Sequence, residues 1–270
     1  NLVCAGAQPI GVTDCLNFGN PERPDIMWQF IMAVEGIADA CRTFQIPVVS
    51  GNVSFYNETN GLSIYPTPIL GMVGLIDRPE DITTQWFKQS GDHIFLLGET
   101  KEDLGGTEYL KVIHSREQGN PPWLDLDREK ALYSFLLTLI QKGLVQSAHD
   151  CSEGGLLVTL AECCLTHPSA LFGATVILNQ DRLRLDALLF GESPSRVVVS
   201  VKSEHVKQLM ELVQGTDVPC TELGQVNQGN MDINVRGAQD RPVCEISLPL
   251  SEMADQWHHA LARQLGAEAP

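Results

Sequence analysis

Apolar residues recur at helical spacing between residues 25 and 44, and short uninterrupted apolar runs flank that segment. In the helical segment they stand three or four residues apart; these positions are Ile26, Phe30, Val34, Ile37, Cys41 and Phe44. The runs at residues 9–13 and 46–49 have the length of buried strands. Residues 9–49 are therefore predicted to form a strand–helix–strand unit. A right-handed parallel crossover would bring the ends of both strands to the same side.

The remainder of the chain alternates short apolar runs with helical patterns. Strands are predicted at residues 69–76, 93–97, 173–178 and 197–201, and near 220–226, 231–235 and 243–247. Helices are predicted at residues 127–142, 156–165, 204–214 and 249–265. A change of composition at residues 77–92 marks the candidate domain boundary. The region after it mixes helices with short strands and is expected to be α+β.

Polar side chains gather where the two strands of the strand–helix–strand unit are predicted to end. Asp14 follows the first run, and the stretch 51–61, with Asn52 and Ser54, follows the second. Open α/β sheets bind ligands at such strand ends, and Gly51 would let a ligand approach the backbone closely. The alternatives are an Asx turn at Asp14 and a polar hairpin closed by an Asn-Gly pair. Composition does not choose between these interpretations.

Composition and charge limit the class of protein. The chain has 270 residues, 43% of them hydrophobic, which is enough for a sizeable core in one large or two modest domains. A net charge of −16 argues against non-specific binding to nucleic acid or to an anionic membrane. It leaves a phosphate-bearing substrate open, because backbone amides and Mg²⁺ can hold phosphates locally. No apolar run is long enough for a transmembrane helix, and from the first residues no signal peptide is expected.

The eight cysteines contain no Cys-x-x-Cys pair, so neither a zinc site nor a thioredoxin-type site is expected. Most lie among apolar residues, which is typical of small core residues in a cytoplasmic protein. The chain begins without Met in what resembles the end of a helix. We therefore expect a piece of a longer polypeptide.

Two glycine pairs precede helical segments and are candidate anion sites. They are Gly105-Gly106 and Gly154-Gly155. Each could bind an anion at a helix N-terminus, but a turn with Thr107 as helix cap is the favoured interpretation of the first pair. His149 and Asp150 precede the second pair. A Ser/His/Asp triad is a poor interpretation there, because the three residues lie within four positions and no nucleophile elbow is present. We expect His149 to be a hydrogen-bonded structural residue.

Several long motifs occur together and in a fixed order. They are Gly11-Val12-Thr13-Asp14, Leu16-Asn17-Phe18-Gly19-Asn20-Pro21-Glu22, Trp28-Gln29, Val49-Ser50-Gly51-Asn52-Val53-Ser54, Tyr56-Asn57-Glu58, Tyr65-Pro66-Thr67-Pro68, Leu104-Gly105-Gly106, Ser147-Ala148-His149-Asp150, Ser152-Glu153-Gly154-Gly155 and Phe190-Gly191-Glu192. Together they closely resemble the second half of phosphoribosylformylglycinamidine synthase, the synthetase subunit of the small multi-subunit type. That family belongs to the aminoimidazole ribonucleotide synthetase-like superfamily.

The resemblance implies a mixed αβ fold of the aminoimidazole ribonucleotide synthetase type. A partial N-terminal αβ domain, with its first strands missing, would occupy residues 1–85, and a C-terminal α+β domain residues 86–270. Residues 191–196 stand where the family's first half has a substrate-binding Glu-Ser-x-x-Arg signature. Here Pro194 alters that signature, so we expect a structural role. The family's catalytic His, its ATP-binding Lys and its main Mg²⁺ carboxylates belong to the first half, and no catalytic residue is expected in this chain.

The implied activity is that of an ATP-dependent ligase that forms a C–N bond in de novo purine biosynthesis. Formylglycinamide ribonucleotide and glutamine-derived ammonia become formylglycinamidine ribonucleotide, with ATP as substrate and Mg²⁺ as cofactor. By motif, Asp14 and Gly51 resemble ATP-binding positions, Asn52 a Mg²⁺ ligand and Ser54 a substrate contact. The implied partners are the first half of the same polypeptide, a glutaminase subunit and a small accessory subunit.

Other interpretations remain open from the sequence. The chain could be a non-catalytic scaffold that stabilises the catalytic half and docks the glutaminase. It could also belong with aminoimidazole ribonucleotide synthetase itself, thiamine-monophosphate kinase or selenophosphate synthetase, although the run at residues 51–61 argues against these. A second nucleotide site near one of the glycine pairs is a further hypothesis.

Overall fold

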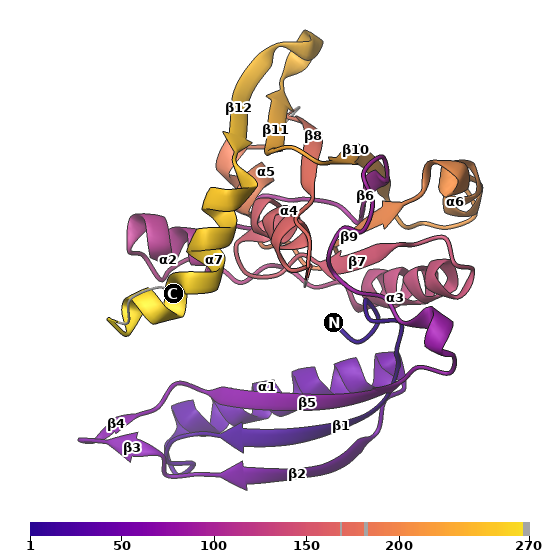
Figure 1. The fold of residues 1–270 in the computed structure, drawn as a ribbon. Helices are drawn as coiled ribbons and strands as arrows, with labels where there is room; N and C mark the ends of the chain where they lie inside the picture. The colour runs from indigo at the N-terminus through magenta and orange to yellow at the C-terminus, as the bar shows by residue number, and fades with distance from the viewer. Residues whose placement is uncertain (168, 181–182, 267–270) are drawn as a thin grey trace. The chain divides into compact units, whose positions relative to one another are not determined.

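The computed structural model describes residues 1–167, 169–180 and 183–266, which divide into two compact units (Figure 1). The small unit consists mainly of Ala7–Pro79, and the large unit mainly of the residues from Glu80 onward. The predicted domain limit between residues 85 and 86 stays a prediction. The end of the predicted second domain, residues 267–270, lies outside the described residues.

The small unit is a three-stranded sheet with one long helix. Its elements are β1 (Gln8–Asn17), α1 (Pro24–Phe44), β2 (Val48–Ser54), β3 (Glu58–Thr59), β4 (Leu62–Ser63) and β5 (Thr67–Leu75). The strand order is β2-β1-β5; β1 is parallel to β2 and antiparallel to β5. Strands β3 and β4 form a separate hairpin. Its turn residues, Asn60 and Gly61, both have positive φ, so the predicted Asn-Gly hairpin is confirmed.

Helix α1 forms where the periodic pattern predicted it. Pro24 in the first turn is preorganised for a helix, and Asp25 complements the helix dipole there. The helix ends at Gln45, which has left-handed backbone angles. Its apolar side packs on the end of β1; this cluster contains Leu16, Phe18, Ile26, Phe30, Ala33, Ile37 and Phe55.

Both strands of the crossover are longer than predicted. Strand β1 does not stop at residue 13 but continues to Asn17, and β2 spans Val48–Ser54 in place of residues 46–49. The sequence-based limits followed the apolar runs. Strand β2 is exposed along nearly all its length, so polar side chains can continue its backbone ladder without losing buried contacts.

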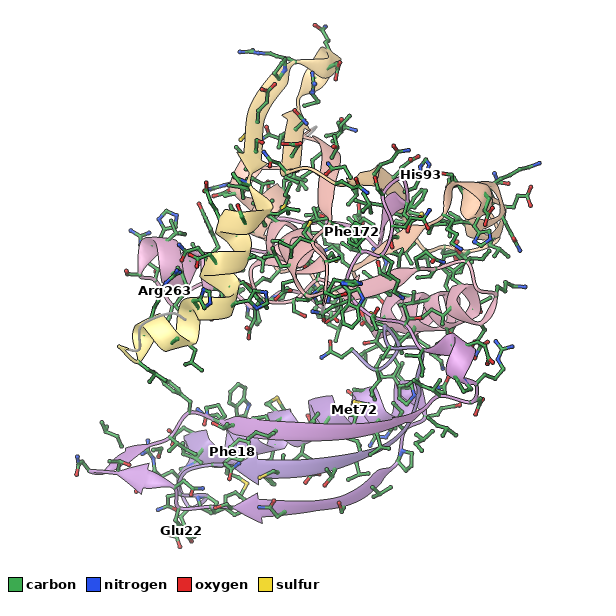
Figure 2. All side chains as sticks on the ribbon, in the orientation of Figure 1. Phe18, Glu22, Met72, His93, Phe172 and Arg263 are labelled. Carbon is green, nitrogen blue, oxygen red and sulfur yellow. The ribbon has the colours of Figure 1, made fainter. Side chains whose placement is uncertain are left out.

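The large unit contains seven strands in one sheet and several helices (Figures 1 and 2). Its strands are β6 (His93–Leu97), β7 (Ser147–Asp150), β8 (Gly173–Asn179), β9 (Val197–Val201), β10 (Cys220–Asn227), β11 (Met231–Arg236) and β12 (Pro242–Leu248). Its α-helices are α2 (Glu108–His114), α3 (Leu126–Gln141), α4 (Gly155–Leu165), α5 (Leu185–Phe190), α6 (Val206–Val213) and α7 (Leu250–Gln264). The described residues also form the 3-10 turns η1 (Pro79–Asp81), η2 (Ser203–His205) and η3 (Ala238–Asp240).

The strand order of this sheet is β12-β11-β8-β10-β6-β9-β7. Strands β8 and β11 pair in parallel, and the other neighbouring pairs are antiparallel. Helices and strands are interspersed along the chain, so the prediction of an α+β region is confirmed. Two local predictions were incomplete: residues 185–190 form a short helix, and residues 147–150 form a strand that the sequence pattern did not predict.

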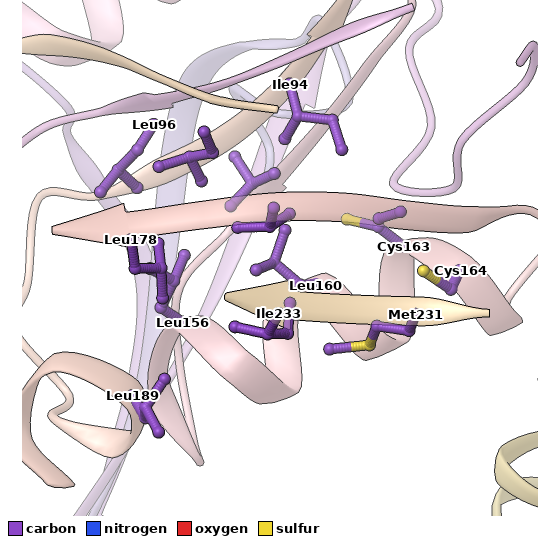
Figure 3. Packing of buried hydrophobic residues seen from close by; sticks show 14 of the residues in the cluster. Ile94, Leu96, Leu156, Leu160, Cys163, Cys164, Leu178, Leu189, Met231 and Ile233 are labelled. Carbon is purple, nitrogen blue, oxygen red and sulfur yellow. The ribbon is translucent and has the colours of Figure 1, made fainter. Parts of the chain in front are cut away.

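Helices cover both faces of the large sheet, and each face has its own apolar core. On β6, Ile94 and Leu96 join the cluster under α4, α5 and α7, part of which Figure 3 shows. Phe95 and Leu97 join the cluster under α3 and α6. Successive side chains of a strand point to opposite faces. A strand buried on both faces therefore has a continuous apolar run, as residues 94–97 of β6 do.

Among the described residues, no helix is both long and apolar enough to cross a membrane.

Candidate functional site

The two strands that flank α1 are direct neighbours, as the crossover predicted. In the parallel register Asp14 lies opposite Gly51, and Asn17 lies opposite Ser54. Asn52 falls between these two rungs of the ladder. The four predicted site residues thus lie on two adjacent strands. They lie within the strands, however, and not in loops beyond the strand ends as predicted.

The Asp14 carboxylate lies over the backbone of Gly51. A Cβ atom on Gly51 would overlap Asp14 Oδ1, and it would also come within 3.1 Å of the Asp14 main-chain oxygen. Asp14 is half-buried and Gly51 is exposed. The missing side chain at residue 51 therefore provides the space for the carboxylate.

The site residues occupy both faces of the strand pair. Side chains alternate along a strand, so Asn52 and Ser54 project from the face opposite to Asp14. Asp14 shares its face with Leu16, which is buried in the cluster under α1. The expectation of a single cluster is thus corrected: the structure brings Asp14 to Gly51 and Asn52 to Ser54, on two faces. In the described sheet β2 is an edge strand, so the two faces meet along its exposed edge.

The opposite face has a polar row of its own. Thr13 Oγ1 and Ser50 Oγ are 2.7 Å apart across the two strands. Further along the same face, Asn17 Nδ2 donates to the Cys15 carbonyl oxygen at 3.3 Å. This row leads to Asn52 and Ser54. It offers hydroxyl and amide groups and no formal charge.

Basic side chains near these strands are already paired. Arg23 donates to Asp25 at 2.9 Å and Arg42 to Asp39 at 2.9 Å. The residues that the structure describes contain no group of three or more His, Cys, Asp or Glu side chains able to hold a metal ion. Asn52 is exposed and offers an amide oxygen, a hard donor suited to Mg²⁺. It fits such an ion as one ligand, and further ligands would have to come from other groups.

The glycine pair at residues 105–106 makes intramolecular contacts. Gly106 N donates to the Gln118 carbonyl at 3.0 Å, and a Cβ atom on Gly105 would overlap the backbone of Asn120. The Thr107 side chain accepts from Leu110 N at 3.3 Å. The predicted helix cap at Thr107 is therefore confirmed.

At the second glycine pair an anion does lie at a helix start, and it is a carboxylate of the chain itself. Glu192 Oε1 accepts from Gly154 N at 2.8 Å and from Glu108 N at 2.9 Å. The carboxylate joins the starts of α4 and α2, where the helix dipoles favour negative charge. These contacts support a structural role for residues 191–196 in place of a second nucleotide site.

Arg196 closes the same segment from inside. Its side chain is 2% exposed. The guanidinium donates to the carbonyls of Ser193 at 2.9 Å and Gly191 at 2.6 Å, and to Thr100 Oγ1 at 3.1 Å. A buried arginine thus holds the loop in a fixed shape from three directions.

His149 lies between two carboxylates, which confirms that it is hydrogen-bonded. Its Nε2 is 2.7 Å from Glu162 Oε2, and its Nδ1 is 3.8 Å from Asp150 Oδ1. Burial lowers the pKa of His149, but the hydrogen bonds to Asp150 and Glu162 outweigh burial and raise its pKa to about 9. The His149 and Ser152 hydrogen bonds hold the pKa of Asp150 well below its usual range. His149 is therefore an imidazolium at neutral pH.

We expect this cluster to make the free energy of unfolding fall as the pH becomes alkaline. The His149 pKa is higher in the folded chain than its ordinary 6.5, so its contribution is complete below pH 6.5 and is lost as the pH rises through about 9. The loss should amount to roughly 2–3 kcal/mol of unfolding free energy. Urea unfolding at several pH values would measure it. His149→Gln should flatten the pH profile, and the exposed His258→Gln should not; equal profiles for both variants would contradict the assignment.

Two family models match the chain over most of its length. The model described as "AIR synthase related protein, N-terminal domain" matches residues 1–76, and the one described as "AIR synthase related protein, C-terminal domain" matches residues 89–235. The chain belongs to the AIR synthase related family. The aminoimidazole ribonucleotide synthetase-like fold expected from the motifs is thereby confirmed.

The curated relatives of this chain that are described next share the name of one enzyme subunit. Phosphoribosylformylglycinamidine synthase subunit PurL of Anaeromyxobacter dehalogenans strain 2CP-C is 44% identical over 283 residues, which cover 100% of this chain and 36% of the relative. PurL of Caldanaerobacter subterraneus subsp. tengcongensis is 46% identical over 257 residues, covering 95% and 34%. The resemblance to phosphoribosylformylglycinamidine synthase is confirmed. The chain spans about a third of the length of these relatives.

Solved structures agree with this fold. A structure named "T. maritima PurL complexed with FGAR" superposes with a TM-score of 0.71 at 21% identity, covering 94% of this chain and 40% of that one. E. coli HypE, a hydrogenase maturation protein, superposes with a TM-score of 0.61 at 17% identity, covering 92% and 75%. At these identities the likeness concerns the fold alone.

Sequence reasoning missed the role of Asn57, which it named only as part of a motif within the polar stretch 51–61. In the structure Asn57 Nδ2 donates to the carbonyls of Phe18 and Ser54, both at 3.0 Å. A signal was present in the spacing. An Asn three residues after a Ser, directly before a hairpin, is well placed to bond the backbone and hydroxyl of the residues that precede it.

Proposed function

We propose that the chain is part of the synthetase subunit of phosphoribosylformylglycinamidine synthase and forms one wall of its substrate site. The observation that carries the proposal is 44% identity to a PurL subunit along the whole chain. The proposed reaction is the ATP-dependent conversion of formylglycinamide ribonucleotide and ammonia to formylglycinamidine ribonucleotide. It takes place in the cytoplasm.

The proposed chemistry proceeds in two steps. The amide oxygen of the substrate attacks the γ-phosphorus of ATP, which releases ADP and leaves an iminophosphate. Ammonia then adds to the activated carbon, and phosphate departs as the amidine forms. A bound Mg²⁺ would neutralise charge on the triphosphate. Residues of this chain bind and orient the reactants.

The four residues divide this work by face. Asp14 and Gly51 are proposed to contact ATP; the missing side chain of Gly51 leaves the Asp14 carboxylate its position over the strand. Asn52 is proposed as one Mg²⁺ ligand and Ser54 as a contact to the ribonucleotide. A ligand lying across the exposed edge of β2 would reach both faces. Paired arginines leave the neutralisation of phosphate charge to a metal ion and to groups outside this chain.

The proposed partners follow from the same relatives. About two thirds of a PurL subunit lies beyond the matched region, and we propose that its first half supplies the catalytic His, the Lys and the main Mg²⁺ carboxylates. A structure named "Structure of PurLQS from Thermotoga maritima" matches this fold. That name supports the proposal that further subunits assemble with this one. We propose that they are a glutaminase, which delivers ammonia, and a small accessory subunit.

The test is ammonia-dependent synthetase activity, measured with the remainder of the synthetase present. Asp14→Ala and Asn52→Ala should each lower kcat/KM at least about tenfold, because each removes a polar contact to the nucleotide or its metal. Asp39→Ala is the control, since it removes a carboxylate on α1 that pairs with Arg42. Wild-type rates for both site variants would leave a scaffold role and overturn the proposal.

A further inference from the structure

Asn57 ties together the segments that follow β1 and β2. Besides the two bonds from its side chain, its main-chain N donates to the Phe18 carbonyl at 3.2 Å. Next to it, Tyr56 N donates to the Gly19 carbonyl at 3.0 Å, and Tyr56 has a φ of 59°. Few non-glycine residues adopt positive φ without such restraint. The end of the polar face is therefore held in one backbone shape.

The same side chain fixes the hydroxyl of Ser54. Ser54 Oγ lies 3.3 Å from Asn57 Oδ1 and 3.1 Å from Asn57 Nδ2. Asn57 Nδ2 donates to Ser54 Oγ as well as to the carbonyls of Phe18 and Ser54. The Ser54 hydroxyl in turn donates to Asn57 Oδ1. A hydroxyl oxygen has two lone pairs, so one lone pair of Ser54 Oγ remains for another donor.

We propose that Asn57 is a positioning residue for the ribonucleotide substrate, acting through Ser54. It sets the rotamer of the Ser54 hydroxyl and accepts the hydrogen bond that this hydroxyl donates, so Ser54 presents only an acceptor lone pair. The substrate group that meets Ser54 is accordingly a hydrogen-bond donor. This inference rests on the proposed function, in which Ser54 contacts the substrate.

The test replaces Asn57 by Asp, which keeps the size but removes both N–H donors. The carboxylate is repelled by the carbonyl oxygens of Phe18 and Ser54 that the amide had bound, so it leaves the position from which Oδ1 fixes the Ser54 hydroxyl. The synthetase is assayed with its remaining part present, with formylglycinamide ribonucleotide and ATP varied separately. KM for the ribonucleotide should rise about tenfold, the effect of one lost or misdirected hydrogen bond. KM for ATP should change less than about twofold, because Asp14 and Gly51 lie on the other face. Asn60→Asp, the same change at an exposed turn residue, is the matched control and should leave both constants unaltered.

A double-mutant cycle separates positioning from general stability. If Asn57 acts through Ser54, Asn57→Asp will cost at least fivefold less in kcat/KM in a Ser54→Ala background than in the wild type. Should Asn57→Asp not fold, Asn57→Gln keeps the amide but displaces it by one methylene, and has to give the same selective rise in KM. Additive losses, or equal rises in both KM values, would overturn the inference.

The outcomes also distinguish this inference from the proposed function. A tenfold loss in Ser54→Ala with no loss in Asn57→Asp would reject the role of Asn57 and leave the proposed function standing. Full activity in Ser54→Ala, Asn52→Ala and Asp14→Ala together would reject both.

Discussion

Replacing Gly51 by alanine is expected to lower the ATP-dependent activity of the reconstituted synthetase by about two orders of magnitude. The added methyl group would occupy the space of the Asp14 carboxylate. Because the Gly51 backbone does not have positive φ, the strand itself should tolerate alanine. The carboxylate would be displaced from its position, and the nucleotide would lose its contact with Asp14. Initial rates at varied ATP concentration would measure the effect.

Two further variants make that result specific. Gly36→Ala is the matched control, because nothing lies within 4 Å of an added Cβ there and alanine favours the helix. The pair Asp14→Ala/Gly51→Ala should be no worse than Asp14→Ala alone, since the overlap is then gone. Wild-type KM for ATP in Gly51→Ala would disprove the assignment of Asp14 and Gly51 to the nucleotide.

Replacing Arg196 by alanine is expected to destabilise the large unit by about 3–5 kcal/mol. The variant leaves the buried carbonyls of Gly191 and Ser193 without their donor and opens a cavity where the guanidinium lay. Arg196→Lys should be intermediate, because a single ammonium cannot reach all three acceptors in the planar geometry of arginine. Equilibrium unfolding in urea would measure these losses.

The control for this result is Arg116→Ala, an arginine that is exposed on the same unit. Its loss should change the unfolding free energy by no more than about 0.5 kcal/mol. Equal midpoints for Arg196→Ala and Arg116→Ala would mean that the 191–196 segment does not need the buried cation. We would then abandon the structural role assigned to this motif.

The elements that the sequence predicted well are those with a burial requirement. Strand β9 is buried at every position, so its residues are restricted by packing. Helix α1 buries only Ile26 fully, and its full apolar period was the signal that predicted it. Strand β2 is exposed, so it tolerates Gly51, Asn52 and Ser54. The prediction ended the strand with its apolar run and therefore placed these three residues in a loop. Strand β7 is four residues long and contains His149 and Asp150, whose polarity hid the backbone pairing with β9.

The sequence predicted which residues form the candidate site but not how they are arranged. The crossover rule placed Asp14 and Gly51 on neighbouring strands, and the register confirmed that they are partners. The division of the site residues between two faces depends on where the strands end. Side chains alternate between the faces only within a strand, and the sequence placed these residues in loops. The role of Asn57 was beyond sequence reasoning for a similar reason. Its bonds to Phe18 depend on how two loops far apart in the chain approach each other.

The position of β1 in the sheet determines when the small unit can fold during translation. Strand β1 comes first of the three yet lies in the middle of the sheet, between β2 and β5. While the ribosome is still adding residues, β1 lacks β2 until the chain has emerged as far as Ser54, and it lacks β5 until the chain has emerged as far as Leu75. Helix α1 can form early, but the sheet on which it packs cannot. Nascent chains of this unit therefore expose unpaired strand edges during translation, the kind of surface that chaperones shield.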